Sequence, residues 1–327
     1  MPVTVLASRY NTLRNQVNLI LGTSNDASPL YGYGQGTTTN SVVGSRSVSN
    51  VADADKVSAQ DYEDLYIDLI RTRSHQVGAS VAIDDFVIGD YDTNTIDTDI
   101  IEEAYILGLE SLATNIVTDK LIVDPANLDI TSLPGASSTR LPTSTWSTVL
   151  THIFTITFDT ALDRRHFFNA GGQIRMSASV DYTGSQAKTV DWQSILNAMG
   201  TISFKAEETV NNAGVGTGSS IGNYDLTSSY QLIYSRTGGA VYSRNRYNLY
   251  AAESSTGNST SAITFKAEFV DGRPNDLRYG IDEVVFGTFN SMVSSARPNS
   301  QININGTDFD AVVISDDPIG ATVRPLS

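Results

Sequence analysis

The N-terminal part of the chain places apolar residues at helical spacing. Between residues 6 and 21 they recur every three or four positions, and a glycine then supplies a stop. A second stripe begins after Ser58, which with Asp61 forms the S/T-x-x-acid pattern of a helix start. A third stripe lies at 99–117. The spacing therefore predicts three amphipathic helices.

After Pro142 the period of the apolar positions changes from about 3.6 residues to about 2. Residues 151–158 and 173–180 alternate apolar and polar side chains, as half-buried strands do. Further strands are expected at 201–207, 228–235, 247–252, 262–269, 283–289, 301–305 and 308–314, with one short helix at 191–199. Short strands separated by Gly, Ser and Asn predict an antiparallel β-sandwich-like domain, and a βαβ fold does not fit.

The predicted fold class is therefore α+β, with a helical region at 1–142 followed by a β-rich domain at 143–327. Within the helical region, residues 22–57 are dominated by Gly, Ser, Thr and Asn. Such a segment has too little apolar surface to fold alone, so we expect an extended arm that orders only against a neighbour.

The charge of the chain is concentrated in one region. Lys and Arg number 21 against 36 Asp and Glu, giving a net charge of -15. Residues 51–130 hold 18 acidic and 4 basic side chains, a net charge of -14. This balance argues against a nucleic-acid partner. The acidic region is either a surface that meets a basic partner or a solvated helical face.

Several classes of site are disfavoured by composition. The chain has no cysteine, which excludes disulfides, Cys-ligated zinc and a thiol nucleophile, and it has only three histidines. No apolar run approaches the roughly 18 residues of a membrane span, and residues 1–9 lack the features of a signal peptide. We therefore expect no membrane attachment, no metal and no cofactor.

The densest polar cluster is the run DRRHFFNAGG at 163–172. A hydrolase would pair His166 with Asp163 and a serine, but no G-x-S-x-G elbow occurs in the chain. We interpret the run as a connection after a strand, in which the charges pair with one another while Phe167 and Phe168 plug the core. His152, on an apolar strand face, is expected to be a hydrogen-bonded core histidine. No catalytic residue is predicted.

Two further patterns resemble ligand loops but fail in detail. The segment from Asp90 to Asn94 opens like a calcium loop, yet Thr95 stands where a glycine is required and Ile101 where a glutamate should close the site. The glycine-rich stretches at 32–36 and 214–218 lack phosphate-loop spacing and are expected to be flexible connections.

Two patterns concern the strands. ISFKAE at 202–207 and ITFKAE at 263–268 nearly repeat, and both are expected to point Phe and Ala inward and Lys and Glu outward. A tyrosine-rich stretch is either a stacking surface for a ligand or a set of strand residues that cover a core edge. Its members are Tyr230, Tyr234, Tyr242, Tyr247 and Tyr250.

Several segments together resemble virion structural proteins of tailed bacteriophages, particularly the contractile-tailed phages of cyanobacteria. They are ASRYNTLRNQVNLILG, YGYGQ, IRTRSHQVG, DRRHFFNAGGQIRMSAS, DWQSILNAMGTISF and DEVVFGTFNSMVSSARP. The resemblance reaches both ends of the chain and is weaker at 81–144. It implies a non-enzymatic component of the tail, neck or fibre, located in a virion that assembles in the host cytoplasm.

A virion subunit buries apolar helix faces against copies of itself and against other virion proteins, commonly in a cyclic homo-oligomer. The residues predicted to make these interactions are Leu6, Tyr10, Leu13, Val17, Tyr62, Leu65 and Leu69. The alternative function is a fibre or decoration module that binds a receptor or glycan through the tyrosines. A depolymerase using paired carboxylates lacks a local signature, since pairs such as Asp84 and Asp85 are only sequence neighbours.

Overall fold

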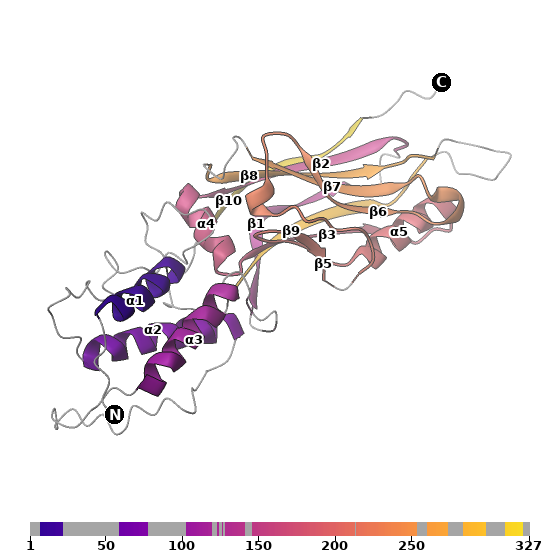
Figure 1. The fold of residues 1–327 in the computed structure, drawn as a ribbon. Helices are drawn as coiled ribbons and strands as arrows, with labels where there is room; N and C mark the ends of the chain where they lie inside the picture. Colours follow the sequence, from indigo (N-terminus) through magenta and orange to yellow (C-terminus); the bar gives the residue numbers. More distant parts are fainter. Residues whose placement is uncertain are drawn as a thin grey trace. The chain divides into compact units, whose positions relative to one another are not determined.

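The chain folds into a helical unit and a β-rich unit (Figure 1). The first comprises Met1–Asp129, Asn169–Gly171 and Pro298–Phe309, and the second comprises the remainder. The computed structural model describes residues 7–21, 59–77, 103–119, 123, 126, 128–140, 146–212, 214–253, 260–273, 284–298 and 311–322. Helices followed by two antiparallel sheets confirm the predicted α+β class.

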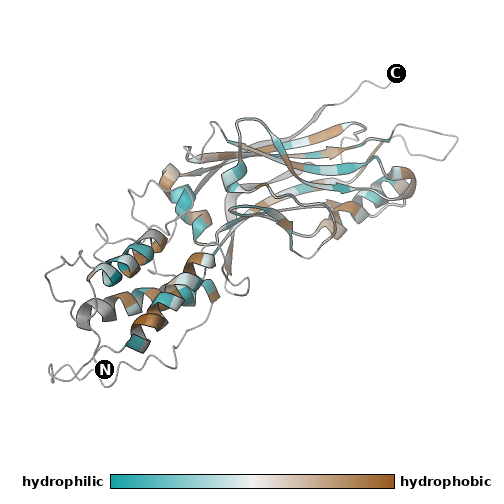
Figure 2. Cartoon of the chain, in the orientation of Figure 1, coloured by the Kyte–Doolittle hydropathy of each residue, from teal (hydrophilic) through white to brown (hydrophobic). Residues whose placement is uncertain are grey.

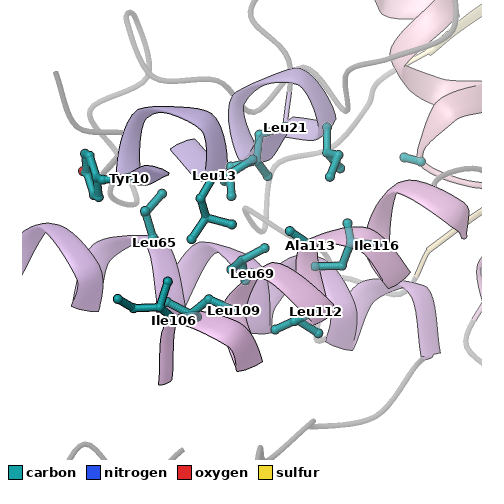
Figure 3. Close-up of a cluster of buried hydrophobic side chains, with 13 residues drawn as sticks. Tyr10, Leu13, Leu21, Leu65, Leu69, Ile106, Leu109, Leu112, Ala113 and Ile116 are labelled. Carbon is teal, nitrogen blue, oxygen red and sulfur yellow. The ribbon is translucent and has the colours of Figure 1, made fainter. Parts of the chain in front are cut away.

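Three helices build the first unit: α1 (Ala7–Leu21), α2 (Ala59–Val77) and α3 (Glu103–Thr118). Their apolar stripes face one another and form a common core, shown in Figure 3. The core consists of Tyr10, Leu13, Val17, Ile20, Leu21, Leu65, Leu69, Ile106, Leu109, Leu112, Ala113, Ile116 and Ala170. Each helix thus covers the apolar stripes of the other two helices within the chain.

Ion pairs link the same helices outside their core. Arg9 on α1 bonds the carboxylates of both Glu103 and Glu110, which lie two turns apart on one face of α3. Arg73 on α2 pairs with Asp119, just beyond the end of α3. The few basic residues of the unit therefore neutralise part of its acidic charge internally.

The second unit contains two five-stranded sheets, with strand orders β1-β9-β3-β4-β5 and β10-β2-β8-β7-β6. The first sheet comprises β1 (Leu128–Arg140), β9 (Thr288–Pro298), β3 (Gln173–Asp181), β4 (Ile202–Phe204) and β5 (Thr209–Asn211). The second comprises β10 (Ala311–Thr322), β2 (Val149–Phe158), β8 (Ala262–Val270), β7 (Arg246–Glu253) and β6 (Gln231–Thr237). Helices α4 (Ala161–Asn169) and α5 (Ala187–Met199) flank β3 in sequence.

The inner faces of the two sheets meet through aromatic side chains. Along β2 and β8, buried residues alternate with partly exposed ones, and Figure 2 shows the corresponding alternation of hydropathy along the strands. Phe204 of one sheet meets Phe265 of the other edge to face, with ring centroids 5.2 Å apart. Phe289 and Phe269 make a second such contact at 5.4 Å. The near-repeat ISFKAE and ITFKAE therefore places its two phenylalanines against each other, with Phe and Ala buried as predicted.

A short segment connects the two sheets along one side. Thr217 pairs with Ser235 of β6, and Ser219 pairs with Thr209 of β5. Gly216 takes a φ of 146° beside the Tyr234 ring, a conformation that L side chains rarely adopt. The glycine-rich stretch 214–218 is therefore a hydrogen-bonded bridge, and its prediction as a flexible connection was wrong.

Other boundaries also differ from the prediction. Strand β1 was not predicted, because Pro134 and Gly135 interrupt the alternation of apolar and polar residues in it. The helical unit therefore ends near Asp129 instead of Pro142. Residues 161–169 form helix α4 instead of a connection, and α5 begins four positions earlier than expected. The expected strand at 301–305 and the arm at 22–57 lie outside the described residues.

The contact between the sheets predicts the effect of core truncation. Replacement of Phe204 or Phe265 by alanine should lower the free energy of unfolding by about 3–5 kcal/mol, because each ring is fully buried and leaves a cavity. Urea denaturation would measure this loss. The control Met292→Ala, at a position 42% exposed on β9, should change stability by less than about 1 kcal/mol. Equal effects of core and control variants would contradict the shared aromatic core.

Candidate functional site

Helix α4 carries most of the polar run DRRHFFNAGG. Its first turn is capped locally, because the Asp163 N–H donates to the Thr160 hydroxyl at 3.1 Å and that hydroxyl donates to the Asp163 carboxylate at 2.6 Å. His166 is buried, and Phe167 and Phe168 lie in the core as predicted. Asp163 therefore serves the start of the helix, and the two phenylalanines serve the core.

Arg164 on the same helix forms a buried ion pair with Glu253 on β7, at 2.7 Å. The side chains are 1% and 0% exposed. The guanidinium also donates to the Asn223 side chain at 2.7 Å and to the Thr260 carbonyl at 3.0 Å. Burial lowers the pKa of Arg164, an effect that Glu253 opposes. The prediction that the charges of this run pair with one another is wrong for Arg164, whose partner lies 89 residues away in the sequence.

A second set of polar contacts fixes helix α5. The Lys188 ammonium pairs with Asp271 at 3.0 Å, and both side chains are buried. Asp191 accepts a bond from the Gly239 N–H at 2.9 Å. Burial raises the pKa of Asp191 and also that of Asp271, although Lys188 opposes the latter shift. The N-terminal part of α5 is thus bound to the segment after β8 and to the connection between β6 and β7.

The candidate tyrosines divide into buried and outward-facing groups. Tyr234, Tyr242 and Tyr247 are at most 7% exposed, so the alternative that the tyrosines cover the core holds for these three, and the ligand-surface prediction is wrong for them. Tyr234 donates to the Val215 carbonyl at 2.8 Å. Tyr230 is 42% exposed and Tyr250 is partly exposed, on the outer face of the second sheet. Strand parity explains the division, because Tyr247 and Tyr250 are three positions apart and lie on opposite faces of β7.

The two outward tyrosines flank one cation. The Lys266 ammonium lies 4.8 Å from the ring centroid of Tyr230 and 4.6 Å from that of Tyr250. It also pairs with Glu268 at 2.8 Å. We call these four side chains the Tyr–Lys cluster. Both tyrosines were predicted from the sequence, but Lys266 and Glu268 were not. The available signal was their outward position on the strand ITFKAE, which places them on the same face as Tyr250.

The predicted docking residues of the helices are used inside the chain. Tyr10, Leu13, Val17, Leu65 and Leu69 are at most 2% exposed and belong to the core of the helical unit. They are therefore not exposed for docking to another subunit, because the three stripes pack on one another. Leu6 and the side chain of Tyr62 lie outside the described residues.

Two histidines have structural hydrogen bonds. His152 shares a bond with the Ser291 hydroxyl at 2.9 Å between the sheets, which confirms the prediction of a bonded core histidine. His75 bonds the Ala170 carbonyl at 2.9 Å. In the described part of the chain, no three His, Asp or Glu side chains gather as metal ligands would. The calcium-like segment at 90–94 lies outside that part.

No described helix is both long enough and apolar enough to cross a membrane. Comparison of the chain with protein-family models, with curated proteins and with solved structures finds no match. The residues themselves must therefore support any functional assignment.

The buried ion pair predicts a double-mutant result. Arg164→Met or Glu253→Leu alone should lower the free energy of unfolding by about 3–5 kcal/mol, because each leaves a buried charge without its partner. Combining Arg164→Met with Glu253→Leu should recover much of that loss in urea denaturation. The control Lys205→Ala removes a partly exposed pair with Glu208 and should cost less than about 1 kcal/mol. Additive losses in the double variant would contradict a mutual buried pair.

The raised pKa of Asp191 predicts a pH dependence. The folded state binds the carboxyl proton of Asp191 more tightly than the unfolded state does. The contribution of Asp191 to stability therefore falls as the pH rises from the ordinary pKa of an aspartate through the raised pKa of the folded state. Asp191→Asn keeps an oxygen acceptor for the Gly239 N–H and removes the titration. The stability of this variant relative to the unsubstituted protein should therefore increase between about pH 4 and pH 7. A difference that is flat or decreases over this range would contradict the desolvation of Asp191.

Proposed function

We propose that this chain is a non-enzymatic structural subunit of a bacteriophage virion, most directly of the tail, neck or fibre. The proposal is based on the resemblance of its segments to virion proteins of tailed phages. It is supported by the roles that those segments take in the fold.

The supporting observation is that the resembling segments provide interior packing. DRRHFFNAGG supplies the capped helix α4, the buried Arg164 and two core phenylalanines. DWQSILNAMG supplies most of α5, whose Trp192 contacts Trp146, Phe269 and Phe289. Side chains of this kind determine a rigid architecture. This is the use of residues that a structural subunit requires.

The proposed partners are copies of this chain and other virion proteins. We infer that the acidic region of the sequence, residues 51–130 with a net charge of -14, provides the surface that meets them. A contact through this surface requires a basic partner and weakens as salt screens the charges. The proposal therefore includes salt-sensitive assembly in the host cytoplasm.

Purified phage particles test the proposal directly. An antibody against this chain should decorate intact particles at one defined position in electron micrographs, and the chain should copurify with particles through a density gradient. An antibody against a non-structural phage enzyme is the matched control and should leave the particles unlabelled. Recovery of the chain only from the soluble fraction of lysed cells would contradict the proposal.

A further inference from the structure

We propose that the outer face of the second sheet, around the Tyr–Lys cluster, binds a neutral saccharide. This inference stands on the described side chains of the sheet and does not depend on membership of a virion.

Two members of the cluster, Lys266 and Tyr250, lie in one row across the second sheet. Lys266 on β8 stands opposite Tyr250 on β7 and opposite Ile153 on β2, and Tyr250 stands opposite Leu232 on β6. Leu232 is 45% exposed and Tyr230, which precedes β6, is 42% exposed. Since these positions point away from the core, their apolar surface is not required for packing between the sheets. Aromatic surface presented in this way offers a platform for the C–H face of a sugar ring.

Polar side chains occupy the row on one side of the platform, although Asn248 at its centre is only 7% exposed. Glu268 stands opposite Asn248 on β7, which stands opposite Ser235 on β6. The Ser235 hydroxyl donates to Asn248 at 2.8 Å, and the Asn248 amide donates to the Tyr250 hydroxyl at 3.3 Å. A carboxylate has about four acceptor sites and an ammonium three donors, so Glu268 and Lys266 retain capacity after pairing with each other. Sugar hydroxyls, which both donate and accept, suit this mixture.

The chemistry of the face favours a saccharide over a macromolecular partner. Lys266 and Glu268 neutralise each other, so the Tyr–Lys cluster itself carries no net charge that would select a polyanion such as nucleic acid. The row on the other side of the platform contains Thr155, Thr264 and Ala252. The centre of a protein interface is depleted in Lys and Glu, whereas both lie at the centre of this face.

The cluster is organised before any ligand binds. The ammonium lies over both tyrosine rings and is bonded to Glu268, while Asn248 is held by Ser235. Side chains fixed by one another lose little conformational freedom on binding. Both rings sit on or beside strands of a sheet whose inner face is fixed by the aromatic core, which is a rigid support for a binding surface.

The full-length chain titrated with cellohexaose, maltohexaose, mannohexaose and chitohexaose tests the inference. Saturation-transfer NMR and calorimetry should show binding of at least one of these neutral probes in the millimolar range or tighter. Tyr250→Ala and Tyr230→Ala should weaken that binding by at least about tenfold, because each removes a stacking ring. The control Met292→Ala, on the outer face of the other sheet, should leave affinity unchanged. Circular dichroism of each variant verifies that its fold is retained.

Three outcomes would overturn the inference. One is the absence of binding to all four neutral probes in the millimolar range. Another is binding that Tyr230→Ala and Tyr250→Ala, folded as the unsubstituted chain, leave unchanged. The third is self-association of the chain that these two substitutions abolish, since the face would then be an interface between copies. Particle labelling is independent of all three, so failure of this inference is distinguishable from failure of the proposed function.

Discussion

The β-rich unit depends on one layer of aromatic side chains that its two sheets share. Phe265 and Phe269 of one sheet meet Phe204 and Phe289 of the other, and Trp192 of α5 contacts two of these rings. Because burying a charge is costly unless it is paired, a charged side chain that enters this apolar interior needs an opposite charge within the protein. The aromatic core therefore determines where the charged residues of the unit are placed.

The buried ion pairs follow from this constraint. Arg164 enters the interior from α4 and is matched by Glu253, and Lys188 enters from α5 and is matched by Asp271. Each pair connects a helix to the second sheet, so the helices are bound in a defined geometry as well as by apolar contact. A polar cluster that in sequence invited a catalytic interpretation is thus a consequence of packing. Tyr230, Tyr250 and Lys266 lie outside this core, on the outer face of the second sheet.

The sequence predicted the fold class and most regular elements, because periodicity reports which residues share a face. It failed where a local break conceals a strand, as at Pro134 and Gly135 in β1, and where partners are distant, as for Arg164 and Glu253. Residue type alone did not separate Tyr247 from Tyr250, whose exposure follows from strand parity. The apolar stripes of the helices were correctly identified, but they were expected to dock to another subunit. Tyr10 of α1 and Leu65 of α2 instead belong to one core within the chain. A stripe shows that a face is buried and does not show what buries it.

The central claim is that the segments DRRHFFNAGG and DWQSILNAMG build the rigid interior of the second unit. Native-state hydrogen exchange measures this most directly, because it reports the free energy at which each backbone amide opens. The account predicts that hydrogen-bonded amides of α4, α5, β2 and β8 exchange only through global unfolding of the unit, with one common free energy. Exchange of α4 and α5 by local opening at much lower free energy, with β2 and β8 still protected, would contradict it.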